Sequence, residues 1–501
     1  MNITKRVVSA LVCIVIAGWA VFTAATATPA KLEEEVPSND GLVIWYTDDS
    51  LSNFMEAACV AYNEMYGVRV VPKLQSGDEY LEQVNKASIE NDSMPDLYVI
   101  TNDMLERAYL GGLAHIVDTD VVNQNHFSPA ALQSVTYRGN PVAYPFYFET
   151  SAMLYNRTYL FNMAQNQIMA EDSTEPDEEE ANEDEAEEEV LDNPEADMTP
   201  EERIEYRIQQ SLPDTFDELM EFADTYDAPM EVETVFKWDV KDIFYNYFFV
   251  GNYINIGGEN GDDPSVIDIY NMDTITALTL YQDLNQFFSF DYEDISYESV
   301  LREFIEGKMV FTTATSDAIK VLEQAKADGE FEYEYGVMRL PQLSENLTTR
   351  SMSVTNTVAV NGYSEKKETA ASFAKFLTIY KAPDLYNMSG KLSACNTVTY
   401  EDAAAQEFVN VYADSKPVPK MMATSNYWLQ AEITFSNIWA GKNVSEQLKQ
   451  LSEQIKEQVT GMDISEDYID VPAEEKEEIQ YYDEDAEREA AQGEEGSEDG
   501  K

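Results

Sequence analysis

After position 41 the chain alternates regularly between strand-like and helix-like patterns. Short apolar runs predict strands at Leu42–Tyr46, Val68–Leu74 and Leu97–Ile100. Apolar residues recur at helical spacing over Leu51–Tyr66 and again over Tyr80–Ser88, which predicts one helix in each interval. Strand–helix–strand units with this spacing build parallel sheets that helices cover. The pattern therefore predicts the α/β fold class.

Acidic residues directly follow two of these predicted strands. Asp48 and Asp49 come just after the strand at Leu42–Tyr46, and Asp103 comes just after the strand at Leu97–Ile100. In open α/β sheets, ligands bind outside the carboxyl ends of the strands. We therefore expect these carboxylates near a ligand, although Asp103 also suits the N-cap of a helix.

A second informative segment is Gly139–Leu160. It contains a glycine turn, a short strand, the aromatic run Tyr144–Phe148 with Glu149 directly after it, and an apolar strand that ends in Tyr155 and Asn156. An aromatic run with a carboxylate beside it can line a ligand cleft. It can equally fill a core, and the residues alone leave both interpretations open.

In its order of features, Gly139–Leu160 resembles the first lobe-crossing segment of family 1 extracellular solute-binding proteins, the maltose-binding-protein type. Eight more segments between Gly41 and Gly461 resemble motifs of this family, in the family's order. They are Gly41–Thr47, Met94–Ile100, Leu110–Ile116, Pro213–Ala223, Phe304–Phe311, Tyr335–Pro341, Ala370–Leu377 and Trp439–Leu448. Each motif is weak alone, and their common order is what indicates the family.

The resemblance implies a two-lobed, periplasmic-binding-protein-like fold, in which each lobe is a mainly parallel sheet flanked by helices and a cleft lies between the lobes. It places the N-terminal lobe at 41–149 and 337–390, and the C-terminal lobe at 150–336 and 391–463. Tyr335–Leu340 is the predicted strand that returns the chain to the first lobe. The loop Leu392–Thr397 resembles the third crossing.

The resemblance also implies a function. Such a protein captures a small ligand by hinge closure and delivers it to the permease of an ABC importer. A carbohydrate ligand needs aromatic planes for its ring faces and carboxylates or amides for its hydroxyl groups. The candidate contacts are Trp45, Asp48, Asp49, Asp103, Glu149, Trp238, Asp239, Asn426, Tyr427 and Trp428. Trp45 has a core position in the first strand as its alternative.

Three local features qualify this set. The family's basic residue after the first-strand acid is absent, because Ser50 stands there, and Ala314–Asp317 stands in place of a turn that carries tryptophan. Trp238 and Asp239 begin an aromatic-rich stretch, Trp238–Ile256, that we predict to be a helix.

The net charge of −63 excludes binding to nucleic-acid phosphates. The segment 171–202 holds 18 acidic residues and no basic one, and the tail 464–501 is similarly acidic. Because such runs bury little apolar surface, we predict a disordered insertion and a disordered tail. The alternative function is a membrane-anchored surface protein that keeps the fold and uses these segments to bind cations or partners.

Residues 1–30 read as a signal peptide or signal anchor, followed by the linker 31–40. Lys5 and Arg6 precede the apolar run Val7–Ala27, which as a helix would be about 32 Å long and could span a bilayer. Cys13 lies inside this run, which makes a poor lipidation motif. We expect an exported protein on the outer face of the membrane, either anchored or secreted.

No motif of an enzyme active site is present, so we expect a binding protein without catalytic residues. The three cysteines and two histidines show no spacing typical of a metal site, and no cofactor motif occurs. We expect a monomer whose partners are a small ligand and a permease.

Overall fold

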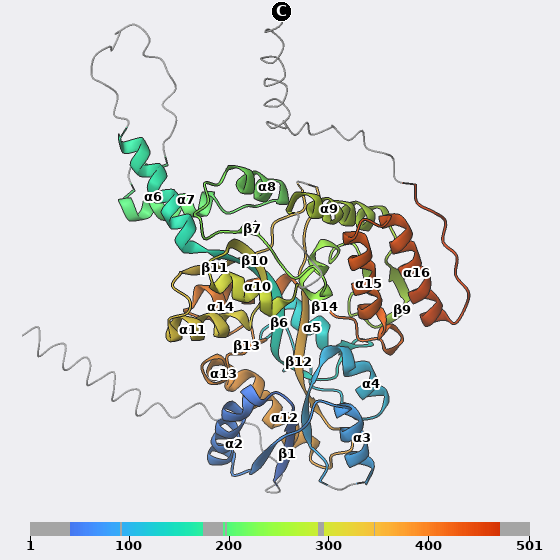
Figure 1. Cartoon of the computed structure of the whole chain (residues 1–501). Coiled ribbons are helices and arrows are strands. Elements are labelled where there is room, and N and C mark those ends of the chain that lie inside the picture. Colours follow the sequence, from blue (N-terminus) through green and yellow to red (C-terminus); the bar gives the residue numbers. More distant parts are fainter. Residues whose placement is uncertain are drawn as a thin grey trace, which may run out of the picture.

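The computed structural model describes residues 41–90, 93–173, 194–195, 198–288, 295–344 and 346–470. They form two α/β lobes joined by one sheet path, with β1–β3 and α2–α4 in the lower lobe of Figure 1 and most other helices in the upper lobe. The two-lobed α/β class predicted from the sequence is confirmed. The predicted targeting segment, the linker 31–40, most of the acidic insertion and most of the tail lie outside the described residues.

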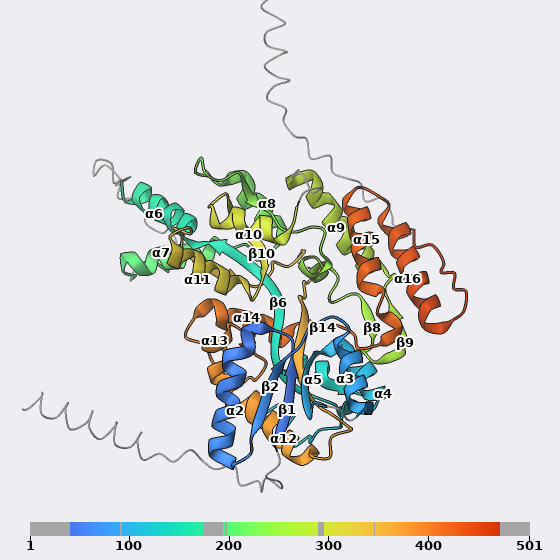
Figure 2. The same cartoon turned by 60° about the horizontal axis from the view of Figure 1, so that its bottom comes forward.

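The first lobe is built on the predicted βαβ units. Its strands follow the order β2 (Val70–Leu74), β1 (Leu42–Tyr46), β3 (Leu97–Thr101), β12 (Met352–Val360) and β6 (Tyr144–Asn156). Strand β1 is parallel to β2 and to β3, as the alternating pattern requires, whereas β12 is antiparallel to β3 and to β6. Figure 2 shows α2 and α13 on one side of these strands, with α3 and α4 on the other.

Strand β6 continues into the second lobe, where its C-terminal half has different partners. It pairs there with β10 (Met309–Thr315) on one edge and with β11 (Tyr335–Met338) on the other, both antiparallel, and β7 (Thr234–Phe236) is parallel to β10. The sheet is therefore mixed rather than mainly parallel. Of the two long crossing strands, β12 runs against the βαβ strands, whereas β6 runs against β12 and therefore in the same direction as β1 and β3.

The helices surround this sheet. In chain order they are α2 (Ser52–Tyr66), α3 (Tyr80–Glu90), α4 (Leu105–Leu110), α5 (Pro129–Val135), α6 (Arg157–Ser173), α7 (Pro200–Gln210), α8 (Phe216–Thr225), α9 (Met272–Phe288), α10 (Tyr297–Ile305), α11 (Ala318–Asp328), α12 (Lys367–Lys375), α13 (Ala382–Ser389), α14 (Ala403–Asp414), α15 (Tyr427–Trp439) and α16 (Val444–Thr460). Short strands complete the fold: β4 (Thr136–Tyr137), β5 (Asn140–Pro141), β8 (Asn255–Gly257), β9 (Asp263–Asp268), β13 (Leu392–Ser393) and β14 (Lys416–Pro417).

The strand that returns the chain to the first lobe is β12, not the predicted segment Tyr335–Leu340. That segment contains β11, and all partners of β11 lie in the second-lobe half of β6. The predicted boundary at residue 337 therefore falls inside a second-lobe strand. Conversely, β13 begins one residue after the predicted boundary at 391, yet it pairs with Tyr147 and Phe148 in the first-lobe half of β6.

The predicted helix Trp238–Ile256 is also wrong. The stretch contains two single turns of 3-10 helix, at Ile243–Tyr245 and Tyr247–Phe249. Asp242 accepts a hydrogen bond from the backbone N–H of Phe244, and the Asn246 amide donates to the carbonyl oxygens of Asp239 and Asp242. Such side-chain bonds to the backbone compete with helical hydrogen bonds, so aromatic density here reflects burial rather than an α-helix.

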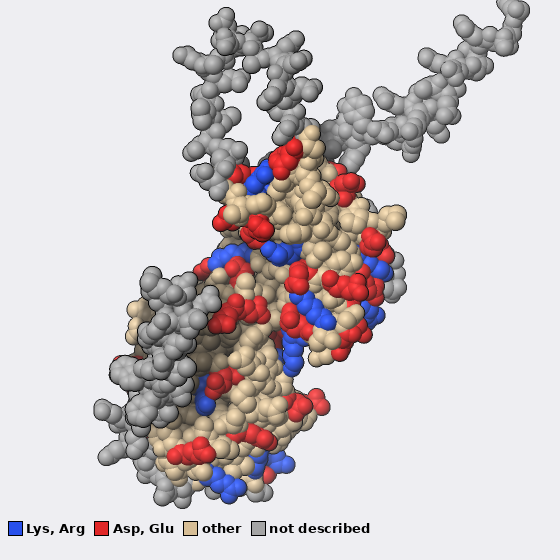
Figure 3. All heavy atoms as spheres, turned by 90° about the vertical axis from the view of Figure 1, so that its left-hand side faces the viewer, with Lys and Arg blue, Asp and Glu red and all other residues tan. Residues whose placement is uncertain are grey.

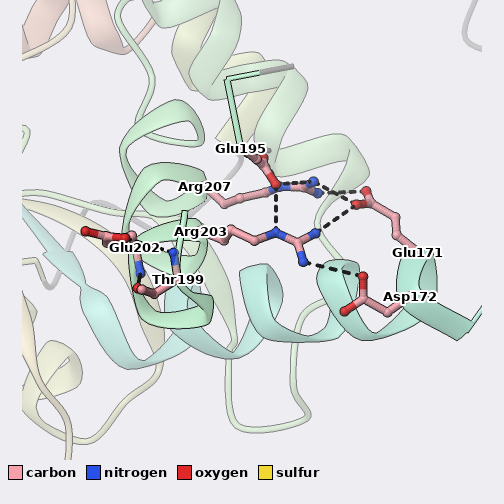
Figure 4. A network of polar contacts seen from close by, with 7 residues as sticks. All are labelled: Glu171, Asp172, Glu195, Thr199, Glu202, Arg203 and Arg207. Carbon is pink, nitrogen blue, oxygen red and sulfur yellow. Dashed lines mark hydrogen bonds and ion pairs between the residues drawn. The ribbon is translucent and has the colours of Figure 1, made fainter. Parts of the chain in front are cut away.

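The ends of the acidic insertion are ordered, which corrects the prediction of disorder over 171–202. Glu171, Asp172 and Glu195 contact two arginines of α7, Arg203 and Arg207, in a group that we call the arginine clamp (Figure 4). Arg207 forms a bidentate pair with Glu171, with both N···O distances at 2.7 Å. The clamp therefore closes the base of the acidic loop.

The start of the acidic tail is ordered as well. Glu466 forms an ion pair of 2.7 Å with Lys456 of α16, and the backbone N–H of Ile469 donates to the Tyr270 hydroxyl at 2.7 Å. Residues 464–470 thus pack against the second lobe instead of beginning a disordered tail. Within the described ranges no helix is both long and apolar enough to cross a bilayer, and Val7–Ala27 lies outside them.

Candidate functional site

The carboxyl end of β1 holds Asp48 in a fixed position. Asp48 caps the short turn Asp49–Leu51, and its Oδ1 accepts hydrogen bonds from the backbone N–H of Ser50 at 2.9 Å and from the Ser50 hydroxyl at 2.7 Å. Its other oxygen, Oδ2, lies 3.1 Å from Nζ of Lys391. Because both oxygens have partners, the carboxylate is oriented before any ligand arrives.

Lys391 joins this carboxylate to the crossing strand. It follows Gly390, which ends α13 with a φ of 78°, and precedes β13. Its Nζ lies 3.2 Å from Oε1 of Glu149 and 5.4 Å from the ring centroid of Tyr147, both on β6. We call Asp48, Tyr147, Glu149 and Lys391 the crossing cluster. It joins the end of β1 to two segments that pass between the lobes.

Hydrogen bonding and charge pairing favour the ionised forms of Asp48 and Lys391. Burial raises the pKa of Asp48, but the hydrogen bonds from Ser50 and the charge of Lys391 outweigh it and leave that pKa below its usual value. Burial lowers the pKa of Lys391, but the charges of Glu149 and Asp48 outweigh it and leave that pKa raised. At neutral pH Asp48 is thus a carboxylate and Lys391 an ammonium group.

A row of polar and aromatic side chains, of which Ser151, Thr315 and Tyr245 are buried, continues from the cluster into the second lobe. Ser151 lies two residues after Glu149, on the same face of β6, and is directly opposite Thr315 of β10. The Thr315 hydroxyl lies 3.2 Å from the Tyr297 hydroxyl, which donates to Asp317 at 3.4 Å. Tyr297 also stacks on Tyr245, with ring centroids 4.6 Å apart. Aromatic planes and a carboxylate therefore continue this row beyond the crossing.

The predicted aromatic pair near the end of the chain forms a separate group. Trp428 is partly exposed, while Tyr427 is buried. The ring of Trp428 lies 5.5 Å from Tyr247 and 4.8 Å from Tyr427, centroid to centroid. Asn426 is partly exposed at the N-terminal end of the same helix, α15.

These findings agree with comparisons to known proteins. Residues 45–379 match the family model described as bacterial extracellular solute-binding protein. The chain belongs to the bacterial extracellular solute-binding protein family. The match runs from the end of β1 through both long crossing strands, β6 and β12, to the helical stretch just after α12.

Solved structures share the fold of this solute-binding protein. A cyclo/maltodextrin-binding protein complexed with maltotetraose matches with a TM-score of 0.65 at 17% identity, over 85% of this chain and 98% of that one. A Staphylococcus aureus extracellular solute-binding protein in complex with maltose matches with a TM-score of 0.65 at 17% identity, over 84% and 98%. The maltose-binding protein MalE from Listeria monocytogenes, in complex with maltose, matches with a TM-score of 0.65 at 16% identity, over 84% and 98%.

Other predicted contacts of the solute-binding protein lie apart from the crossing cluster. Asp49 and Asp103 are exposed at the ends of β1 and β3. Trp45 is 7% exposed and lies between Lys73 of β2 and Tyr98 of β3 in the sheet, so the structure favours its alternative position in the core. The first-strand acid that reaches the cluster is thus Asp48 rather than Asp49.

Trp238 and Asp239 belong to the core of the second lobe. Trp238 is fully buried, stacks on Phe236 at 4.6 Å and donates its indole N–H to Asn246 at 2.8 Å. Asp239 is buried and accepts the backbone N–H of Lys241 at 2.9 Å. Both side chains already have their partners inside the protein. We therefore remove them from the candidate site.

Lys391, Tyr245 and Tyr297 were missed by the sequence reasoning. The sequence did contain one indication of Lys391. The family's basic residue is absent at Ser50, and two carboxylates in a cleft require a cation from another part of the chain. Tyr297 contacts Thr315 and stacks on Tyr245. Thr315 belongs to Ala314–Asp317, the stretch in which the family's tryptophan is absent. In the described part of the chain, no three His, Cys, Asp or Glu side chains group as metal ligands. The arrangement offers hydrogen-bond donors, acceptors and aromatic planes.

Proposed function

We propose that this protein captures a carbohydrate between its lobes and delivers it to the permease of an ABC importer. The observation that carries the proposal is the crossing cluster, which links the end of β1, strand β6 and the segment before β13 through Lys391. Solved structures of similar fold are complexes with maltose or maltotetraose. The chemistry of the cluster and of the neighbouring tyrosines suits a neutral ligand rich in hydroxyl groups.

The ligand contacts that we propose come from both lobes. Asp48 and Glu149 accept hydrogen bonds from hydroxyl groups, Lys391 donates to ring or hydroxyl oxygens, and Tyr297 and Trp428 offer aromatic faces to sugar rings. Asp49, Asp103 and Asn426 remain proposed contacts at the rim, where their partial or full exposure leaves them free to turn toward a ligand. The protein binds its ligand unchanged and acts as a monomer.

Hinge closure follows from contacts on both sides of the crossing. A ligand that touches both lobes only when they are closed shifts the equilibrium toward the closed form. The permease then recognises that form. Strands β6 and β12 provide the hinge. They pair with each other at the crossing, and β6 continues from there to pair with β10 in the second lobe.

A thermal-shift screen against neutral mono- and oligosaccharides tests the proposal. A ligand present at 100 times its dissociation constant adds about 2.7 kcal/mol to the free energy of unfolding. For a ligand so found, calorimetry of Glu149→Gln and Trp428→Ala should show affinities lower by about 10- to 100-fold, because each loses one strong contact. Glu56→Gln, on the exposed face of α2, is the matched control with unchanged affinity.

Two results would contradict the proposal. If no carbohydrate in the screen raised the melting temperature, carbohydrates would be excluded as the ligand class. Unchanged affinity of both variants for a sugar that does bind would place the ligand elsewhere on the molecule. A melting temperature of the variants close to that of the wild type shows that any loss of affinity is not a loss of folding.

The N-terminal segment provides the tether in this proposal. Val7–Ala27 stays uncleaved as a membrane-spanning helix, and the stretch Thr28–Asp40 connects it to the lobes over at most about 45 Å. Mass spectrometry of the protein isolated from membranes should find the chain intact at its N-terminus. A mature chain that starts at Thr28, or a lipid on Cys13, would replace this anchor by cleavage or by lipidation.

A further inference from the structure

A groove of about 580 Å³ follows the outer edge of β11, in the second lobe. Helices α7, α11 and α14 contribute its walls, and residues from Glu334 to Arg339 form one side. This is the left-hand part of the upper lobe in Figure 1, on the side of the molecule that Figure 3 faces, where acidic and basic side chains are interspersed. None of the residues proposed for the sugar site lines it.

The pairing register shows which backbone groups of β11 face this groove. The N–H of Arg157 donates to the carbonyl of Glu334 at 2.8 Å, which places these two residues at a hydrogen-bonded position of the antiparallel ladder, although the N–H of Glu334 donates to the Thr158 hydroxyl instead. Such pairs alternate along the strands. Gly336 is therefore bonded to Tyr155, and Tyr335 and Val337 direct their backbone N–H and C=O groups away from β6.

The other edge of β6 confirms this alternation. The carbonyl of Phe311, which lies opposite Tyr155 in the β10 ladder, accepts the N–H of Lys237 from the far side of β10. The Phe311–Tyr155 pair is therefore not bonded across that ladder, and the backbone groups of Tyr155 point toward β11. Among the described residues, no backbone or side-chain group is bonded to the outward N–H and C=O groups of Tyr335 and Val337.

The edge is also sterically open to another backbone. Gly336 has no side chain, and the Tyr155 ring lies directly over it, so that a Cβ there would come within 2.1 Å of the ring. Tyr335 is held to one side, since its hydroxyl donates to Glu323 of α11 at 3.1 Å. The strand therefore presents a flat edge with the two unpaired residues at its centre.

Charge around the groove favours a basic occupant. Five carboxylates and three cations line it. Each cation already has a carboxylate: Arg157 pairs with Glu205, Lys326 with Glu334 at 2.7 Å, and Arg339 with Asp414 at 2.9 Å. Asp402 accepts hydrogen bonds from the backbone N–H of Ala404 at 2.9 Å and from the Tyr386 hydroxyl at 3.0 Å. Glu323 accepts one from the Tyr335 hydroxyl at 3.1 Å and lies 3.8 Å from Lys326, which Glu334 approaches more closely. The surplus charge is negative.

We propose that this groove binds an extended, basic polypeptide segment that pairs with β11 and adds a strand to the second-lobe sheet. Strand addition to a free edge takes its affinity from main-chain hydrogen bonds and its selectivity from the side chains on either face. Tyr335 and Val337 supply two donors and two acceptors, and the carboxylates select Lys or Arg at the flanking positions. The site is independent of the sugar site and lets a protein partner hold this lobe.

Two fluorescent hexapeptides test the proposal by anisotropy: one alternates Val with Lys, and the other alternates Val with Glu. The full-length protein should bind the basic peptide and should bind the acidic one about tenfold more weakly or less. Val337→Pro removes the outward N–H without touching the ladder to β6, as proline is tolerated at a strand edge. It should weaken binding of the basic peptide about tenfold. The control Val337→Thr keeps the N–H and should bind like the wild type.

The proposal is also testable without a variant. A basic peptide N-methylated on the residues that face β11 keeps its charge but lacks the amide hydrogens, and it should not bind the wild-type protein. If the N-methylated peptide bound at full strength, or if the unmodified basic peptide bound Val337→Pro at full strength, the binding would be due to charge attraction alone. Either result would overturn strand addition. Competition by maltotetraose would overturn it too, because the groove would then be a carbohydrate site. The sugar affinity of Val337→Pro should equal that of the wild type.

Discussion

The crossing cluster and the arginine clamp are both groups of paired charges, but their surroundings differ. In the cluster, the side chains of Lys391, Asp48 and Glu149 are 19%, 29% and 40% exposed. In the clamp, the side chains of Glu171 and Asp172 are 54% and 63% exposed, although Glu195 and the two arginines are more covered. Water screens the attraction within an exposed ion pair, and it solvates an exposed charged side chain that loses its partner. Similar chemistry is therefore expected to contribute more to the structure at the crossing than at the base of the acidic loop.

The two groups also differ in how far apart in the sequence they join the chain. Lys391 and Glu149 are 242 positions apart, whereas Arg207 and Glu195 are 12 apart. The cluster constrains how two lobes and three segments meet. The clamp constrains only the two ends of one loop. We propose on this ground that the cluster acts on the hinge and on ligand binding, while the clamp acts only on the two ends of the insertion.

The largest effect is expected for Lys391→Met. It removes the cation between two partly buried carboxylates, which then repel each other, and should lower the free energy of unfolding by about 1–2 kcal/mol. Urea unfolding at pH 7 measures this as a lower midpoint with an unchanged slope. Lys381→Met, which breaks a pair with the more exposed Asp384, is the control and should change stability by less than about 0.5 kcal/mol. If Lys391→Met and Lys381→Met lowered the free energy of unfolding equally, the difference in exposure between the two ion pairs would have no effect on stability.

A smaller effect is expected when both clamp arginines are replaced, as in Arg203→Ala with Arg207→Ala. The loss should stay below about 1 kcal/mol at pH 7 because the pairs are largely at the surface. Hydrogen bonds from Arg207 lower the pKa of Glu171 and of Glu195 in the folded protein. Their contribution is therefore present above the unfolded pKa and is lost as the pH falls through the folded one. The difference between variant and wild type should shrink below about pH 4, and a difference that grows in acid would contradict this assignment.

The smallest effect is expected for the loop that the clamp closes. Replacing residues 174–193 by a short Gly-Ser linker keeps Glu171, Asp172 and Glu195 in place. The free energy of unfolding should change by less than about 0.5 kcal/mol, since closure entropy varies only slowly with loop length. Sugar affinity should be unchanged. A broadened or two-step unfolding curve would mean that the acidic residues stabilise the second lobe directly.

Several elements could be predicted because their signals are local. Helix α8 starts where Thr215 and Glu218 form a capping box, inside the segment Pro213–Ala223 that resembles a helix start of the family. The βαβ units follow from apolar periodicity, which records burial within each element. Glu149 and Asp48 were predicted site residues because they stand at fixed offsets from strands that the sequence marks clearly.

Other features had no local signal. The stretch after Trp238 has the aromatic content of a buried helix, but side-chain bonds from Asp242 and Asn246 break it into short turns. The residues next to Lys391 in the sequence do not indicate that its ammonium group contacts Asp48. That contact forms only because the turn after β1 and the segment before β13, which are far apart in the sequence, pack together. The position of Trp238 was misjudged for the same reason, since an aromatic residue has the same local pattern in a core as in a cleft.

The sequence by itself determined the alternation of strands and helices, the crossing segment with its acidic and aromatic residues, and the position of the acidic insertion along the chain. These depend on burial, capping and charge within short stretches of chain. Only the tertiary structure decided that β12 returns the chain to the first lobe, that Lys391 supplies the cation absent at Ser50, and that β11 keeps a free edge. Each of these depends on which distant segments become neighbours, and that is settled by packing and hydrogen-bond pairing over the whole fold.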